Sequence, residues 1–320
     1  MPAADAGALR VFDAAAVADG LPYARLIDAL QAGFRAEVEA PVRAHHHVER
    51  PGAAPGDLLL MPAWQPGAAT GVKLVTISPG NEERGLASVQ ALYVLFDGPS
   101  GVPRAVLDAA PLTVRRTACA SALASFYLSR PESRHLVMVG AGALAPHLIR
   151  AHAAVRPIDR VSIWNRTRAK AEQLAGGLRQ EGVSAAAVDD LDEVLPDADI
   201  VSCATMAREP LVKGVLLAPG CHVDLVGAYR PDMREADDDA VRRAELFVDT
   251  RAGALAEAGD IILPLERGVI ATGAIRADLF DLCRGRHRGR TDRAAITLFK
   301  SVGSALEDLV AARLVVEGSA

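Results

Sequence analysis

The segment HLVMVGAGALAPHL at 135–148 constrains the fold of this chain more than any other. An apolar run at 135–140 predicts a buried strand, and 143–154 predicts the helix that follows it. Between them stands a G-x-G-x-x-A pattern, the turn that places a dinucleotide pyrophosphate at a helix N-terminus, where unpaired N–H groups favour anions. The pattern alone is a weak signal, but its strand–turn–helix setting strengthens it. The residues expected to contact a cofactor here are Gly140, Gly142, Ala143, Leu144 and Ala145.

Strand and helix patterns alternate after this turn, at a spacing that builds a parallel, doubly wound sheet. The predicted fold class is therefore α/β, with a Rossmann domain. Thr205, Val226 and Gly227, at the ends of two later strands, are also expected to contact the cofactor. The expected elements are strands at 161–164, 184–188, 199–205, 222–228 and 246–250, and helices at 168–181, 190–198 and 252–259.

The tip of the second expected strand reads Asn165-Arg166-Thr167. A site for NAD usually has an acid at this place, which accepts hydrogen bonds from the ribose hydroxyls but repels a 2′-phosphate. Asn165 is neutral, Arg166 can pair with a phosphate and stack on adenine, and Thr167 can donate a hydrogen bond. The tip therefore favours NADPH, with NADH as the alternative cofactor. The competing interpretation is an arginine that simply lies at a solvated strand end.

The N-terminal part has a different pattern, in which apolar strands are separated by Gly and Pro turns. Such a pattern is typical of a mostly antiparallel sheet. A long helix at 111–130 is expected to link this sheet to the nucleotide domain. The expected strand regions are 55–64, 70–81 and 88–110.

The C-terminal stretch 290–316 reads as helical, and we expect it to pack back on the N-terminal sheet. The N-terminal domain would then be discontinuous in sequence. This predicts an α+β domain formed by residues 1–125 and 290–320, and a Rossmann domain at 126–289.

Composition excludes several classes of function. The net charge is −5 with 23% charged residues of both signs, so no basic field points to nucleic acid or an anionic membrane. The N-terminus lacks a signal-peptide pattern, and no apolar run approaches the roughly 20 residues that span a bilayer. We therefore expect a cytoplasmic protein. The cysteines lack metal-ligand spacing and are expected to be reduced and mostly buried: Cys119, Cys203, Cys221 and Cys283.

Several segments occur in the order seen in one known family. They are PVRAHHH, TGVKLVTISPGN, the stretch from GLASVQALYVLF to RRTACASALA, GAGALA, VGAYRPDMREADD, FVDTRAGALAEAGD and LFKSVGSALEDLVAARL. Through them the chain resembles the ornithine cyclodeaminase/mu-crystallin family over nearly its whole length. The resemblance implies an N-terminal domain for substrate binding and dimerisation, a Rossmann domain, an active site in the cleft between them, and a homodimer.

The resemblance also implies roles for single residues. Arg43, Lys73 and Arg116 match positions that bind the carboxylate of an amino-acid-like substrate, which guanidinium and ammonium groups suit chemically. Lys73 can in addition act as a proton donor if burial and neighbouring cations lower its pKa. Ser88 and Thr117 match positions that contact the substrate or the nicotinamide end of the cofactor.

The chain departs from the cyclodeaminase branch at two positions. That branch carries a Glu before Leu-Met-Pro and an Asp after the later Val-Gly, where this chain has Leu59 and Tyr229. Leucine cannot transfer protons, and tyrosine does so only when its pKa is tuned. The VGAYRPDMRE and NRT segments resemble instead the members that reduce cyclic ketimines, such as Δ1-pyrroline-2-carboxylate and Δ1-piperideine-2-carboxylate, to L-proline and L-pipecolate.

The resemblance therefore favours an NADPH-dependent ketimine reductase acting on a small imino acid. Three alternatives stay open: an alanine-dehydrogenase-like oxidoreductase, an ornithine cyclodeaminase, and an NADPH-linked binding protein of the mu-crystallin type.

Three consecutive histidines, His45 to His47, raise the question of a metal. Consecutive residues in a strand or loop cannot all face one ion, and no cluster of Asp, Glu or Cys lies nearby in the sequence. We expect no metal site, with a role of one histidine in the substrate cleft as the alternative.

Overall fold

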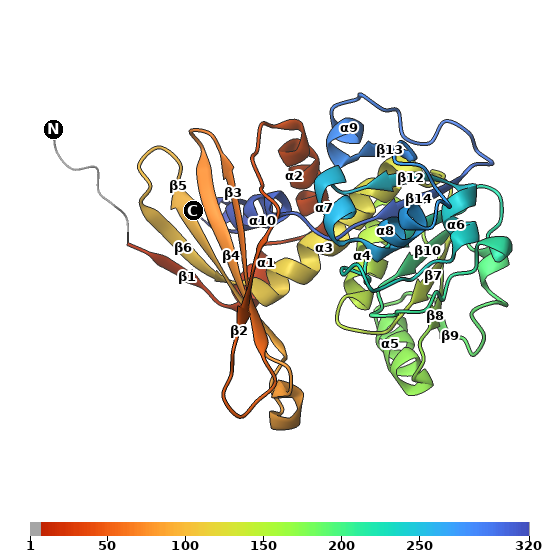
Figure 1. Ribbon diagram of the computed structural model, residues 1–320, viewed down its shortest axis with the longest axis horizontal. Helices are drawn as coiled ribbons and strands as arrows, with labels where there is room; N and C mark the ends of the chain where they lie inside the picture. The colour runs from red at the N-terminus through yellow and green to blue at the C-terminus, as the bar shows by residue number, and fades with distance from the viewer. Residues whose placement is uncertain (1–7, 320) are drawn as a thin grey trace. The chain divides into compact units, whose positions relative to one another are not determined.

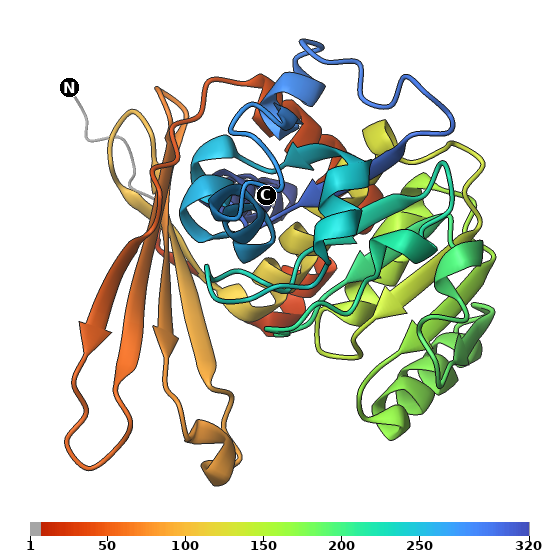
Figure 2. The same cartoon turned by 45° about the vertical axis from the view of Figure 1, so that its right-hand side comes forward.

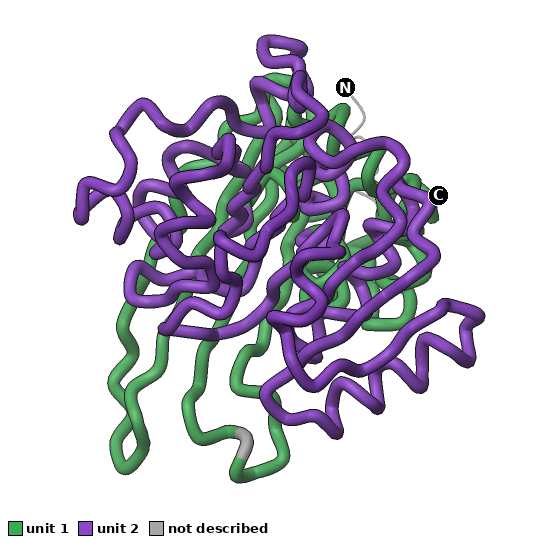
Figure 3. Tube along the Cα trace, turned by 90° about the vertical axis from the view of Figure 1, so that its right-hand side faces the viewer, with its two compact units in different colours: residues 1–116, 304–320 green, residues 117–303 purple. Residues whose placement is uncertain are grey.

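The structure is a computed structural model that describes residues 8–319, apart from the side chain of residue 82. The chain forms two compact units (Figure 3): unit 1 is Met1–Arg116 with Ser304–Ala320, and unit 2 is Thr117–Gly303. Unit 1 is thus built from both ends of the chain. The predicted boundaries lay near 126 and 289, and the continuous helix α3 (Ala109–Leu128) runs through both the predicted and the observed first boundary.

Unit 1 is a six-stranded sheet in the order β1-β6-β5-β4-β3-β2. Neighbouring strands from β2 to β6 are antiparallel, and only the β1–β6 pair is parallel. Figure 2 shows the β2–β3 and β4–β5 hairpins as long ribbons of this sheet. The strands are β1 (Arg10–Phe12), β2 (Ala44–Val48), β3 (Gly56–Gln65), β4 (Ala69–Ile77), β5 (Val89–Asp97) and β6 (Pro103–Asp108), with the 3-10 helix η1 (Asn81–Arg84) between β4 and β5.

Helix α10 (Ala305–Gly318) returns the C-terminal segment to unit 1, where it packs against strands β3, β4 and β5 (Figure 1). It begins with a capping box, in which the Ser304 side chain and the Glu307 side chain satisfy each other's backbone N–H groups. Helix α1 (Ala14–Asp19) is followed by helix α2 (Tyr23–Arg35), and α2 packs on α10. Gly33 permits this approach, because a Cβ there would lie 2.5 Å from Val310 Cγ2.

Unit 2 is an eight-stranded parallel sheet in the order β13-β12-β14-β11-β10-β7-β8-β9, with helices between the strands (Figure 1). This confirms the predicted α/β class with a doubly wound sheet. The strands are β7 (His135–Val139), β8 (Arg160–Trp164), β9 (Ala185–Ala187), β10 (Ile200–Cys203), β11 (His222–Leu225), β12 (Ala244–Val248), β13 (Ile275–Asp278) and β14 (Ile296–Lys300). The helices are α4 (Ala145–Val155), α5 (Arg168–Gln180), α6 (Asp238–Arg243), α7 (Arg251–Glu257), α8 (Gly259–Glu266) and α9 (Leu279–Cys283), with 3-10 helices η2 (Leu195–Asp197) and η3 (Gly214–Leu216).

Two predicted helices are wrong. Of the helix expected at 190–198, only the short η2 forms, since Pro196 lacks the N–H that a longer helix would need. Of the stretch expected to be helical at 290–316, the first part contains strand β14, which lies between β11 and β12 in the sheet. Only the part from Ala305 onward is helical.

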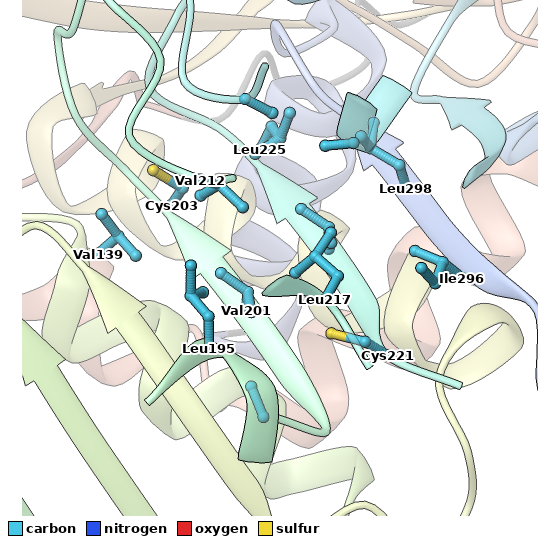
Figure 4. Packing of buried hydrophobic residues seen from close by; sticks show 14 of the residues in the cluster. Val139, Leu195, Val201, Cys203, Val212, Leu217, Cys221, Leu225, Ile296 and Leu298 are labelled. Atoms are coloured by element: carbon cyan, nitrogen blue, oxygen red, sulfur yellow. The ribbon is translucent and has the colours of Figure 1, made fainter. Parts of the chain in front are cut away.

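The core on one side of the unit 2 sheet is a continuous apolar cluster (Figure 4). Alternate residues of β7, β10, β11 and β14 point into it, among them Val139, Val201, Leu225 and Leu298. Burial of these strands on both faces is typical of a parallel sheet. The cluster anchors the strands whose carboxyl ends carry the loops described below.

All four cysteines are buried and free of disulfide bonds. Of the helices within 8–319, none is long and apolar enough to cross a membrane.

Candidate functional site

Unit 2 has a pocket at the switch point of its sheet. Strands β9, β8, β7, β10 and β11 follow the order 3-2-1-4-5 of a Rossmann sheet, and the strand order reverses between β7 and β10. Ligands of such sheets bind beyond the carboxyl ends of the strands at this point. A pocket of ≈ 400 Å³ lies there, lined by Gly140, Ala141, Gly142, Trp164, Asn165, Arg166, Thr167, Lys170, Ala204, Thr205, Met206, Ala207 and Leu211.

The two glycines of the turn, Gly140 and Gly142, lie in different structural environments. Gly140 has φ +106°, and a Cβ there would lie 2.7 Å from the carbonyl oxygen of Ala204. At Gly142 a Cβ would meet nothing within 4 Å, so this backbone borders open space. Ala145, buried, begins α4 directly behind it. The turn therefore presents exposed backbone at a helix N-terminus, which suits a pyrophosphate.

Asn165 joins the turn to the tip of β8. Its Oδ1 accepts a hydrogen bond from Ala141 N at 3.2 Å, and its Nδ2 donates to the carbonyl oxygen of Thr167 at 2.9 Å. Both ends of the amide therefore hold the backbone, and Asn165 also lines the pocket.

Two cations line the pocket, Arg166 and Lys170, both with exposed side chains. Neither side chain has a hydrogen-bond or ion-pair partner among the residues that the structure describes. Arg168, by contrast, pairs with Glu172 at 2.8 Å and with Asp189. The lining residues include no acid. The pocket therefore presents cationic side chains and no carboxylate to a bound ligand.

Of the other residues predicted to contact the cofactor, only some line this pocket. Thr205 lines it, and Ala143 lines a neighbouring groove between α4 and α5. Leu144 caps α4. Val226 and Gly227 follow β11 outside the lining, and Thr117 is buried within α3.

Unit 1 holds a second, buried cluster of charges. Lys73 of β4 lies 2.9 and 2.8 Å from the two carboxylate oxygens of Asp308. Arg116 of α3 donates through Nε to Asp308 Oδ1 at 2.9 Å and through an Nη to Glu307 at 2.7 Å. Lys73 is 2% exposed and both acids are 0% exposed, so this is a closed network of two cations and two anions.

Arg43 lies close to this cluster. It precedes β2, and its guanidinium is 4.0 Å from the Met61 sulfur. Met61 is the β3 residue directly opposite Lys73 in the register. The structure therefore brings together the three cations Arg43, Lys73 and Arg116 that the resemblance placed around a carboxylate.

The network changes the acidity of its members. Burial lowers the pKa of Lys73 from 10.5 to about 8; Arg116 and Arg43 lower it too, while Asp308 opposes the shift. Burial alone would lower the pKa of Arg116, but Asp308 and Glu307 raise it above its usual value. At neutral pH Lys73 is thus charged, yet it can release its proton far more readily than an exposed lysine.

Sequence reasoning missed Glu307 and Asp308. The S-x-x-E spacing from Ser304 to Glu307 predicts a capping box, and an acid at a helix start is ordinarily explained by the helix dipole. Nothing local in the sequence links these acids to Lys73, which lies more than 200 positions earlier. Tyr93, which pairs with Lys73 in the strand register, was missed as well. Its ring lies over Gly71, where a Cβ would be only 2.1 Å from the Tyr93 hydroxyl.

Other residues considered from the sequence lie outside this cluster. Ser88 lies just before β5, five residues from Tyr93, the β5 residue that pairs with Lys73. Five residues of a strand span about 17 Å, so Ser88 is far from Lys73. Leu59 is buried in β3, and Tyr229 is 39% exposed in unit 2. The histidines at 45–47 lie in the exposed strand β2, where alternation sends neighbours to opposite faces. Within 8–319 no three His, Cys, Asp or Glu residues are grouped to hold a metal ion.

The network predicts how the pKa of Lys73 responds to Asp308. Because Asp308 raises that pKa by its charge and hydrogen bond, Asp308→Asn is expected to move it further below about 8. NMR titration of 15N-lysine-labelled protein measures the shift. The control is Glu307→Gln, which changes a carboxylate bound to Arg116 and should move the pKa of Lys73 less. A Lys73 that titrates near 10.5 in the unmodified protein would contradict this account.

Comparison with known proteins gives consistent results. A Δ1-pyrroline-2-carboxylate reductase of Paracoccus denitrificans is 44% identical over 262 residues, covering 82% of this chain and 83% of that protein. The structure of the Thermococcus litoralis Δ1-pyrroline-2-carboxylate reductase with NADH and L-proline superposes with a TM-score of 0.91 at 33% identity, covering 97% of both chains. An archaeal alanine dehydrogenase dimer with bound NAD has a TM-score of 0.90 at 28% identity, covering 97% of this chain and 96% of that chain.

The family model described as "Ornithine cyclodeaminase/mu-crystallin family" matches residues 10–320. The resemblance inferred from the sequence is confirmed, and the chain belongs to the ornithine cyclodeaminase/mu-crystallin family.

Proposed function

We propose that this chain is an NADPH-dependent reductase that converts cyclic ketimines of the Δ1-pyrroline-2-carboxylate and Δ1-piperideine-2-carboxylate type to L-proline and L-pipecolate. The observation that carries the proposal is the buried Lys73, which has a pKa of about 8 and lies beside Arg116 and Arg43. The named reductase activity of the Paracoccus and Thermococcus relatives agrees with it.

Unit 1 would bind the imino acid. Lys73 and Arg116 are held in place by Glu307 and Asp308, and Arg43 lies beside them. A substrate carboxylate would accept hydrogen bonds from these cationic donors. Its orientation would place the C=N bond in a fixed position, which supplies much of the rate in such reactions.

Lys73 would supply the proton for the ring nitrogen. A general acid is most effective when its pKa lies near the working pH, and burial brings Lys73 to about 8. Asp308 keeps Lys73 charged at neutral pH. Leu59 cannot handle protons, which disfavours the cyclodeaminase alternative, since that reaction needs further acid and base groups.

Unit 2 would bind NADPH, which supplies a hydride when bound. The turn at Gly140 and Gly142 would hold the pyrophosphate, and Arg166 with Lys170 would pair with the 2′-phosphate. The absence of an acid from the residues lining the pocket is the feature that favours NADPH over NADH.

We also infer that the chain is a homodimer. Tyr93 points to the α10 side of the unit 1 sheet, so strand alternation sends Leu92 to the opposite face, where it is 50% exposed. Val48 lies on the same face by the strand register and is 41% exposed. Apolar side chains exposed together on one face of a sheet are typical of an association surface.

The reductase activity is tested by the loss of NADPH absorbance with Δ1-pyrroline-2-carboxylate. We expect turnover that falls as pH rises through about 8 and that drops by at least about 100-fold in Lys73→Ala, since general acids contribute this much. Lys213→Ala, which changes an exposed lysine of unit 2, should keep full activity. Turnover of pyruvate with ammonia, or of ornithine with NAD+, in place of the ketimine would contradict the proposal.

Arg166→Ala tests the cofactor preference. We expect the Kd of NADPH to rise roughly 10- to 100-fold, because a charged hydrogen bond to the 2′-phosphate is lost, while the Kd of NADH changes little. Fluorescence titration measures both constants. Arg168→Ala is the matched control, since its guanidinium is already engaged by Glu172 and Asp189. Equal losses of NADH and NADPH binding would sink the 2′-phosphate assignment.

The dimer is tested by light scattering of the protein in solution. We expect a molar mass near twice the 33.5 kDa of one chain, and a shift toward the single-chain value in Leu92→Glu, which places a charge on the apolar face. A single-chain mass for the unmodified protein would rule the dimer out.

A further inference from the structure

Unit 2 contains a second buried charge network, apart from the pocket lining. Glu235, Asp260 and Lys300 are each 0% exposed. Lys300, the last residue of β14, lies 3.1 Å from Asp260 and 3.8 Å from Glu235. Asp260 lies in α8, and Glu235 lies in the segment between β11 and α6. Buried charges are costly, so a network of three needs an explanation.

The Glu235 carboxylate is surrounded by donors. Its Oε1 accepts from the backbone N of Thr205 at 2.6 Å and from the Thr205 hydroxyl at 2.9 Å. Its Oε2 accepts from the backbone N of Gly227 at 2.8 Å and of Ala228 at 3.2 Å. Each oxygen therefore takes two hydrogen bonds, which only an ionised carboxylate can do without turning a proton toward a donor.

These contacts fix the segment that lines one wall of the cofactor pocket. Thr205 lines the pocket itself, and its hydroxyl also accepts from the backbone N of Ala207 at 3.4 Å. The backbone carbonyl of Glu235 accepts from Leu211 N at 2.9 Å. Thr205, Ala207 and Leu211 all line the pocket: Thr205 is bound by the Glu235 carboxylate, Ala207 by the Thr205 hydroxyl and Leu211 by the Glu235 backbone.

Glu235 also holds two strand ends together. Thr205 follows β10 and Gly227 follows β11, the strands next to the switch point. A Cβ at Gly227 would lie 1.9 Å from the carbonyl oxygen of Thr205 and 2.6 Å from Glu235 Oε1. The two loops are therefore in direct contact, and Glu235 bridges them from behind.

The other two members of the network support this arrangement. Asp260 Oδ1 accepts from the backbone N of Glu235 at 2.8 Å and of Ala236 at 3.1 Å, which fixes the backbone that carries the glutamate. Burial raises the pKa of Glu235, and Lys300 opposes this by favouring the charged form, while Asp260 adds to the rise. Lys300 is thus the group that compensates the two carboxylates.

We propose that Glu235 is a positioning residue for cofactor binding: its carboxylate holds Thr205, in the wall of the pocket, and the Gly227–Ala228 loop in the arrangement that accepts the nicotinamide nucleotide. The proposal rests on the proposed function in one respect, that this pocket binds such a nucleotide. Glu235 itself does not line the pocket, so it acts through Thr205 and not by contact with the ligand.

The test is the Kd of NADPH in Glu235→Gln, measured by fluorescence titration. A glutamine keeps one acceptor oxygen, but its amide N–H groups would face a pair of N–H or O–H donors on the other side. We expect the Kd to rise about tenfold or more, as loss of hydrogen bonds to a charged group implies. At saturating NADPH the KM for the ketimine should stay unchanged, because the imino acid is assigned to unit 1.

Asp249→Asn is the matched control. Asp249 is also 0% exposed in unit 2, and it accepts four hydrogen bonds, from Thr250 N, the Ser301 hydroxyl, Val302 N and Gly303 N. It does not line the pocket, so Asp249→Asn should lower Tm while leaving the Kd of NADPH unchanged. An equal rise in Kd in both variants would reduce Glu235 to a structural role and overturn the proposal.

The remaining outcomes are also decisive. If the unmodified protein binds NADPH and Glu235→Gln binds it equally well, this inference fails and the proposed function stands. If the unmodified protein binds neither NADPH nor NADH, both fail. Should Glu235→Gln not fold, Thr205→Val takes its place: it removes the hydroxyl that donates to Oε1 and accepts from Ala207 N, and we expect a Kd about three- to fivefold higher. An unchanged Kd in folded Thr205→Val would overturn the proposal.

Discussion

The carboxylate of Asp308, shared between Lys73 and Arg116, is the interaction on which the unit 1 site depends. Two cations can lie buried side by side only if anions compensate them, since each uncompensated buried charge costs on the order of several kcal/mol. Asp308 meets both cations within 2.9 Å. It is supplied by α10, which explains why the last segment of the chain must return to the unit formed by the first.

Unit 2 handles charge in a related way. The pocket wall exposes Arg166 and Lys170 to an anionic ligand and places no acid among its lining residues. The acids lie behind the wall, where Glu235 and Asp260 are compensated by Lys300. In both units a buried carboxylate thus organises the elements that would touch the ligand, without being offered to the ligand itself.

Local sequence patterns predicted the parts of the molecule that depend on local geometry. The turn at Gly140 follows from its own glycines and flanking strand and helix, and the cations at 43, 73 and 116 were recognised through the family resemblance. Distant pairings were not predictable in the same way. Asp308 reads as an ordinary helix-start acid, and Glu235 as one of several acids in a polar loop; only the fold places them beside Lys73 and Lys300. The apolar run at 296–300 fits a strand or a helix equally, and its neighbours β11 and β12 decide for a strand.

In the proposed reaction, a hydride reaches C2 of a cyclic imino acid whose carboxylate is held by Arg43, Lys73 and Arg116. The most direct measurement is mass spectrometry of the product formed from Δ1-pyrroline-2-carboxylate and NADPH deuterated at C4 of the nicotinamide. The account predicts L-proline that carries one deuterium, at C2. The account would be contradicted if no proline formed, or if the proline carried no deuterium whichever of the two C4 hydrogens of NADPH was replaced by deuterium.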